Sequence, residues 1–149
     1  MIQRIQSVFL LLAASAGFGQ FAAPYVTTDS GNPAASLPAL ADNVLNPFDN
    51  PGLLGLCALS GIVSLTALFL FRNRPLQARL CGAAAIASLL LTILTAFVVF
   101  QITQQMPAGG NLHYGAGLAL PVLTMLFDWL AARFIRKDEN LVRSMDRLR

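Results

Sequence analysis

The chain has 149 residues, of which 56% are hydrophobic and only 11% carry charged side chains, with a net charge of +3. A soluble domain normally carries about 25% charged residues. The composition therefore excludes a soluble enzyme, a nucleic-acid-binding domain and a disordered tail. It indicates a small integral membrane protein.

Four apolar stretches are long enough to cross a membrane as helices. About 20 apolar residues cover a hydrocarbon core about 30 Å thick, and such stretches lie at about 5–26, 53–71, 80–102 and 114–135. Each must be helical because lipid offers backbone N–H and C=O groups no hydrogen-bond partner. The sequence thus predicts an all-α fold, a bundle of four transmembrane helices that forms a single domain.

The positions of Lys and Arg predict which loops face the cytoplasm. All ten lie in the N-terminus, in the loop between the second and third spans, or in the C-terminal segment, and the other two loops have none. Because basic loops stay on the inner side, both termini are predicted to be cytoplasmic and 27–50 to be an outer loop. Six of these basic residues are candidate contacts for anionic lipid: Arg72, Arg74, Arg79, Arg133, Arg136 and Lys137.

A cleaved signal peptide is the alternative interpretation of the N-terminus. Arg4, the apolar run and the small residues Ala14, Ser15 and Ala16 fit that template. The apolar stretch, however, continues through Phe21, beyond the cleavage position. We therefore expect an uncleaved first span.

Three segments resemble a known family. The opening MIQRIQSVFLLLAA (1–14), the basic loop segment QARLC (77–81) and the ending RKDENLVRSMDRLR (136–149) are similar to the bacterial DUF4293 family. The resemblance spans the chain, although loop 27–50 has no matching signature. It implies a four-helix, multi-pass protein of the bacterial inner (cytoplasmic) membrane, and it carries over no activity and no catalytic residues.

Asp128 is the acidic residue inside a predicted span, and carboxylates within membranes are candidates for function. It precedes Arg133 by five residues, or about 7.5 Å along a helix, which places it near the inner headgroups. A structural ion pair, or a carboxylate that extends to the membrane interface, is the simplest interpretation, and a proton or cation site is the alternative. Neighbouring helix ends offer four arginines for such a pair: Arg4, Arg72, Arg74 and Arg79.

Pro121 lies inside the fourth predicted span and cannot donate a hydrogen bond to the Gly117 carbonyl. We therefore expect a bend in the helix at this position. A static kink is the simpler interpretation. A gating hinge is the alternative, and with Asp128 it would serve a small oligomeric transporter or channel.

Other residues that could support chemistry are sparse. Cys57 and Cys81 are predicted near opposite membrane faces, on the order of 20 Å apart, whereas a disulfide needs Cα atoms within about 7 Å. His113 is the one histidine, and no spacing resembles a metal site. The sequence thus predicts no enzymatic activity, no cofactor and no metal.

Small and hydroxyl-bearing residues predict close packing of the helices. Ala13 with Gly17, and Cys57 with Gly61, follow a spacing that lets helix backbones approach each other in lipid. Hydroxyls such as that of Ser64 are expected to bond across helices. A compact bundle within one chain is the simpler interpretation, and a homo-oligomer is the alternative.

The outer loop carries signals for a short helix that would lie on the membrane surface or cover the bundle. Ser36 could cap this helix. Asn50 resembles the N-cap of the second span, with Pro51 at its first helical position. The apolar side of the short helix would consist of Leu37, Leu40, Val44 and Leu45.

The C-terminal tail, 136–149, is predicted to form a short amphipathic cytoplasmic helix. Leu141, Met145 and Leu148 fall at i, i+4 and i+7, which places them on one face. This face could lie on anionic headgroups or bind another membrane or cytoplasmic protein. The leading functional hypothesis is therefore a non-enzymatic accessory or scaffold protein that acts through partner contacts.

Overall fold

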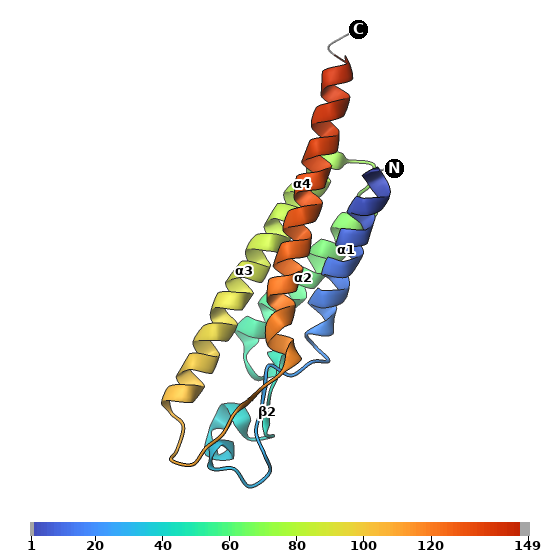
Figure 1. Cartoon of the computed structure of the whole chain (residues 1–149). Helices are drawn as coiled ribbons and strands as arrows, with labels where there is room; N and C mark the ends of the chain where they lie inside the picture. Colours follow the sequence, from blue (N-terminus) through green and yellow to red (C-terminus); the bar gives the residue numbers. More distant parts are fainter. Residues whose placement is uncertain (1, 147–149) are drawn as a thin grey trace.

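The structure, a computed structural model, describes residues 2–146, with side chains described for 5–141, and is mostly helical. Its four α-helices lie side by side (Figure 1). Each helix packs against the next in the chain, and α4 also packs against α1, so α2 and α4 face each other across the centre. The helices are α1 (Ile2–Gly19), α2 (Pro51–Phe69), α3 (Arg74–Gln104) and α4 (Leu120–Asp146).

One end of the helices carries a small antiparallel sheet, which the sequence did not predict. Its strand order is β2-β1-β3, so the loop after α1 is joined to the loop before α4. We call this the sheet end and the opposite end, near the N-terminus, the tail end (Figure 1). The strands are β1 (Val26–Thr27), β2 (Val44–Leu45) and β3 (His113–Tyr114).

The loop between α1 and α2 does not contain the short helix expected after Ser36. It forms one-turn 3₁₀ helices instead, η1 (Pro33–Ser36), η2 (Pro38–Leu40) and η3 (Pro47–Asp49). Each begins with proline, which lacks an N–H and cannot continue a helix that precedes it. The cap of η1 is Asn32, whose Oδ1 accepts a hydrogen bond from the Ala34 N–H at 3.0 Å.

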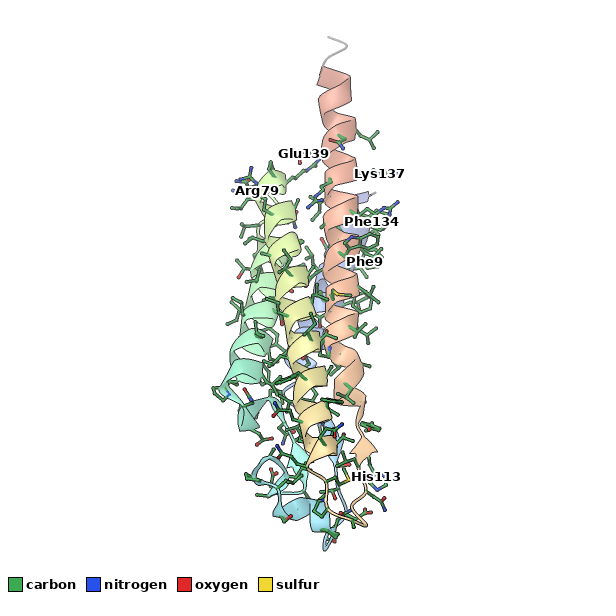
Figure 2. The ribbon with its side chains drawn as sticks, turned by 90° about the vertical axis from the view of Figure 1, so that its left-hand side faces the viewer. Phe9, Arg79, His113, Phe134, Lys137 and Glu139 are labelled. Carbon is green, nitrogen blue, oxygen red and sulfur yellow. The ribbon has the colours of Figure 1, made fainter. Side chains whose placement is uncertain are left out.

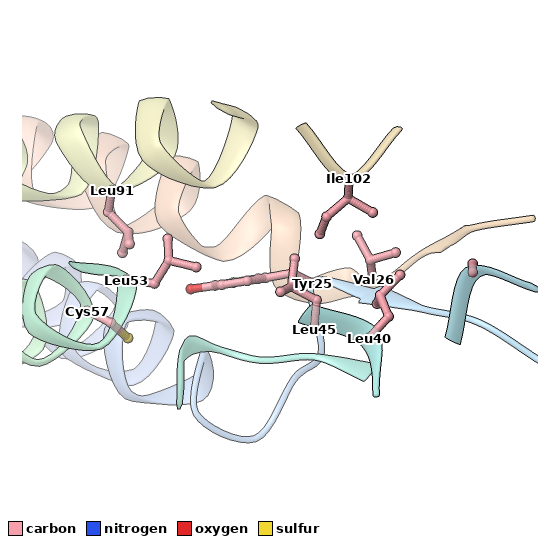
Figure 3. Close-up of a cluster of buried hydrophobic side chains, with 9 residues drawn as sticks. Tyr25, Val26, Leu40, Leu45, Leu53, Cys57, Leu91 and Ile102 are labelled. Atoms are coloured by element: carbon pink, nitrogen blue, oxygen red, sulfur yellow. The ribbon is translucent and has the colours of Figure 1, made fainter. Parts of the chain in front are cut away.

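This loop folds back over the sheet end and shares one apolar cluster with the helices. Tyr25 is fully buried within the cluster, between the loop residues and the helix residues (Figure 3), and its O–H donates to Gln20 Oε1 at 3.1 Å. The loop thus covers the end of the helices, as one of the two sequence-based alternatives expected. The cluster consists of Tyr25, Val26, Ala34, Leu40, Leu45, Leu53, Cys57, Leu91 and Ile102.

The sequence predicted the start of α2 correctly but not the end of α1. The first span was expected to reach residue 26, but α1 ends at Gly19 and the chain turns, with Phe21 N–H bonded to the Phe18 carbonyl at 3.1 Å. The start of α2 is confirmed, because Asn50 Oδ1 accepts from the Gly52 N–H at 2.8 Å and Pro51 opens the helix.

The predicted bend at Pro121 is wrong because α4 begins at Leu120, so Pro121 lies in its first turn. A helix leaves the N–H groups of its first turn without intrahelical partners, and proline is tolerated there. The chain before it forms the 3₁₀ helix η4 (Ala116–Ala119), and the Gly117 carbonyl accepts from the Leu120 N–H.

The C-terminal segment is not a separate short helix, because α4 runs unbroken to Asp146 and extends past the other three helices (Figure 1). No glycine or proline occurs between residues 122 and 146 to stop it. An ion pair between Arg74 and Asp138, with nitrogen and oxygen 2.8 Å apart, ties α4 to the start of α3.

The helices bury small and polar residues and expose large apolar ones. The buried residues of α2, for example, are mostly small, including Ser60, Gly61 and Ser64. Such an arrangement suits lipid, where small residues allow close helix packing and apolar side chains contact the acyl chains. Exposed apolar side chains on α2 and α3 include Leu59, Ile62, Phe69, Ile86, Leu90, Ile93, Phe97 and Phe100.

Three helical segments are long and apolar enough to cross a membrane. They are Pro51–Phe69, Arg74–Gln104 and Ala116–Leu141, whereas the apolar part of α1, Ile5–Gly19, is shorter. The whole of α1 has 18 residues, which rise about 27 Å.

The close helix packing that the small residues predicted is present between α1 and α2, at Gly17 and Gly61. A Cβ added to Gly17 would lie 3.0 Å from the Cα of Gly61, so the backbones are nearly in contact. Cys57 supports the same contact, since its S–H donates to the Gly17 carbonyl at 3.6 Å.

Gly117 provides a test of the contact between the start of α4 and the chain after α1. A Cβ there would lie 2.5 Å from the carbonyl oxygens of both Ala23 and Pro24. Gly117→Ala is therefore expected to lower the unfolding free energy by about 1–3 kcal/mol, because backbone must move. Thermal unfolding in detergent measures the change, and Gly55→Ala is the control, since nothing lies within 4 Å of its added Cβ. Equal stability of both variants would contradict the close approach.

Candidate functional site

Asp128 lies at the centre of the four helices. It is fully buried on α4, and its Oδ2 lies 2.8 Å from Ser64 Oγ on α2, the helix diagonally opposite. Ser64 Oγ is also 2.8 Å from the carbonyl oxygen of Ser60. The second carboxyl oxygen, Oδ1, is buried without a hydrogen-bond partner among the described residues.

The number of protons in this cluster favours an uncharged Asp128. The Ser64 hydroxyl has one proton, so it can donate to Asp128 or to the Ser60 carbonyl but not to both. If Asp128 is a neutral acid, its own O–H can donate to Ser64 while Ser64 donates to Ser60. If it is ionised, Ser64 must donate to it and no longer to the Ser60 carbonyl. Among the described residues no cationic side chain pairs with Asp128, and a buried charge without an opposite charge costs several kcal/mol.

The arginine partner that the sequence suggested for Asp128 is not the partner in the structure. Its hydrogen-bond partner is Ser64, and Arg74, one of the proposed arginines, pairs with Asp138. Arg72 and Arg79 are exposed at the tail end. The side chain of Arg4 lies outside the described residues.

Most hydroxyls in the helices bond within their own helix, whereas the sequence led us to expect bonds across helices. Thr66, Thr92, Thr95 and Thr124 each donate to the carbonyl four residues earlier. Ser64 differs from these four residues, because its hydroxyl also lies within hydrogen-bond distance of a side chain on another helix. Its contact with Asp128 is a polar link between α2 and α4.

A second feature is a groove of about 1140 Å³ on the outer side of α3 and α4. Its apolar walls come from Ile86 and Leu89 on α3 and from Met125, Leu126 and Trp129 on α4. Gly82 and Ala85 leave room between the helices. No sequence pattern indicates this groove, because it depends on how two helices distant in the chain are rotated against each other.

Three of the six candidate lipid contacts gather at the tail end of the groove, and three do not. Arg133, Arg136 and Lys137 line it, whereas Arg72, Arg74 and Arg79 are outside it. Figure 2 shows Arg79 and Lys137 at the same end of the molecule, far from His113. The structure therefore separates the basic residues of the tail end into two groups.

The three residues of the predicted partner face are only partly described. Leu141 lines the groove at its tail end and is 45% exposed. The side chain of Met145 and the whole of Leu148 lie outside the described residues. Their common face therefore stays a prediction.

Of the remaining chemistry-bearing residues, Cys81 lies close enough to Asp128 and Arg136 to interact with them electrostatically, and the others lie outside the Asp128 cluster and the groove. Cys57 and Cys81 are buried free thiols. At the sheet end, His113 Nε2 lies 3.2 Å from Asp29 Oδ2, and both side chains are exposed. Among the residues described, no group of three or more His, Cys, Asp or Glu side chains is placed to hold a metal ion.

The fold is mostly helical, and three of its apolar helices indicate a membrane protein by their length and composition. The family described as a domain of unknown function, DUF4293, matches residues 2–148, and the chain belongs to it. The resemblance of the two ends and the basic loop is thereby confirmed. Comparison with curated proteins and with solved structures gave no match.

The Asp128 cluster can be tested by two substitutions with opposite expectations. Asp128→Asn retains a donor for Ser64, so its unfolding free energy is expected to stay within about 0.5 kcal/mol of wild type. Ser64→Ala removes the partner of the buried carboxyl and is expected to cost about 1–2 kcal/mol, a typical value for a bond between membrane helices.

Reversible unfolding in mixed micelles at pH 7 measures both values. Thr66→Ala is the matched control on the same helix, because Thr66 is exposed and bonds only to the Ile62 carbonyl in its own helix. A loss in Asp128→Asn as large as that in Ser64→Ala would show that the negative charge is required.

Proposed function

We propose that the protein is a non-enzymatic accessory or scaffold protein of the bacterial inner membrane, acting through contacts with a partner. In this proposal all four helices cross the bilayer as one bundle, with both termini in the cytoplasm. The large exposed apolar side chains support a lipid environment, and the confinement of all ten Lys and Arg residues to the proposed inner side supports the orientation.

The observation that carries the proposal is the extension of α4 past the other helices (Figure 1). Asp138 pairs with Arg74 at the start of α3, and α4 continues from there for eight residues to Asp146. Eight residues rise about 12 Å. A helix that projects from the inner membrane surface offers its sides to a cytoplasmic protein or to the cytoplasmic part of another membrane protein.

The transporter hypothesis receives less support from the same residues. Asp128 faces Ser64 inside packed helices, and Pro121 occupies the first turn of α4, where it does not bend the helix. A proton or ion pathway would normally contain several polar groups in one cavity. The accessory function is therefore the better interpretation.

The experiment compares proteins captured in mild detergent by the full chain with those captured by a chain ending at Asn140. This truncation removes the projecting end but keeps Asp138 and its ion pair with Arg74. We expect a near-stoichiometric partner with the full chain and at least a tenfold loss with the shorter one. Mass spectrometry quantifies both samples.

The control is the Thr66→Ala full chain, altered at an exposed side chain of α2 that is not part of the projecting end. It should retain the partner. The absence of any partner from both chains, each folded and monodisperse, would overturn the proposed function.

A further inference from the structure

The groove between α3 and α4 has one apolar part and one basic part. The apolar part follows α4 from Met125 to Ala132, and the basic part follows it from Arg133 to Lys137. Eight residues of helix rise about 12 Å, close to the thickness of half a hydrocarbon core, about 15 Å. The groove thus has the length and the polarity gradient of one lipid leaflet.

The basic side chains of the groove are held by specific contacts. The guanidinium of Arg133 lies 5.6 Å from the centre of the Trp129 ring, a cation–π contact. A Cβ added to Gly82 would lie 3.8 Å from Arg136 Nη2. The Arg136 side chain therefore reaches across to α3 at Gly82, where glycine leaves room for it. Both guanidinium groups therefore lie against residues that line the groove.

The charged side chains among the described lining residues are all positive. They are Arg133, Arg136 and Lys137, and the lining contains no Asp or Glu. The neighbouring acid Asp138 pairs with Arg74. Guanidinium groups bind phosphate through paired N–H donors, and the Asn140 amide at the same end adds a neutral donor.

We propose that this groove binds an anionic phospholipid, with an acyl chain along α3 and α4 and the phosphate headgroup at Arg133, Arg136 and Lys137. This proposal rests on one part of the proposed function, the placement of the helices in a membrane. It does not depend on a protein partner. Arg72, Arg74 and Arg79 take no part in it, since they lie outside the groove.

Trp129 provides a direct probe of the site. It is the one tryptophan of the chain, it lines the groove, and it is 53% exposed. Bromine on a lipid acyl chain quenches tryptophan fluorescence on contact, so the intensity reports which lipid occupies the groove. The full chain is reconstituted in phosphatidylcholine vesicles that contain equal mole fractions of brominated phosphatidylglycerol or brominated phosphatidylcholine.

We expect the brominated anionic lipid to quench wild-type Trp129 more strongly than the brominated zwitterionic lipid. Arg136→Gln combined with Lys137→Gln should reduce the relative affinity for the anionic lipid by about fivefold for each side chain removed. Arg133 is retained in this variant because it contacts the fluorophore. The matched control is Arg72→Gln combined with Arg79→Gln, which removes two exposed basic residues outside the groove and should keep the preference.

Gly82→Leu tests the apolar part of the same groove. The larger side chain fills the space between α3 and α4, so quenching by both brominated lipids should fall while the protein still floats with the vesicles. Co-flotation of every variant separates a failed lipid site from a failed membrane placement, because a protein that does not float contradicts the proposed membrane function itself.

Three outcomes would overturn the lipid site. Equal quenching by the two lipids in wild type would exclude headgroup recognition. An equal loss of preference in both double variants would assign the effect to general surface charge. Weak quenching by both lipids, together with a cross-linked dimer, would show that a second copy of the chain covers the groove.

Discussion

The hydrogen bond between Ser64 and Asp128 is the interaction on which the arrangement of the helices depends. It joins α2 and α4 across the centre, where the two helices otherwise have little contact. A carboxyl group in an apolar interior has no water to bond with, so it must face the partner that the protein supplies. This requirement fixes the rotation of α4 about its axis.

The other faces of α4 follow from that rotation, since successive residues of an α-helix are about 100° apart. With Asp128 directed to the centre, Phe127 and Phe134 fall on one flank, where both contact Phe9 of α1. Phe9 and Phe134, which Figure 2 shows side by side, stack with ring centres 5.5 Å apart. Trp129 and Arg136 fall on the opposite flank and line the groove with α3. One buried carboxyl thus positions both the α1 contact and the proposed lipid site.

The sequence predicted the features that depend on local chemistry or on the membrane itself. Composition alone indicated four apolar segments, and the spacing of Gly17 and Gly61 on their helices indicated the close contact that the structure contains. The cap at Asn50 was predictable because it requires only the side chain of Asn50 and the following Pro51. The partner of Asp128 was not predictable, since Ser64 is 64 residues away and the choice depends on helix rotation.

The sheet, and the loop that covers the end of the helices, could not be predicted from sequence patterns either. Strands of two residues are too short to show an alternation of polar and apolar side chains, and β1 pairs with β3 only because the helices bring two distant loops together. The Pro121 prediction failed for a related reason. Whether a proline bends a helix depends on where the helix begins. Here Gly117 precedes α4 and lies close against the backbone at Pro24, so α4 begins only after it.

Infrared spectroscopy of Asp128 tests the central claim, that a neutral carboxyl holds α4 to α2. Carboxyl groups in contact with water are ionised at pH 7, so a carboxylic acid C=O band at that pH identifies a buried neutral acid. The account predicts such a band in wild type, its loss in Asp128→Asn and a shift in Ser64→Ala. A spectrum of wild type and Asp128→Asn that differs only in carboxylate bands would contradict it.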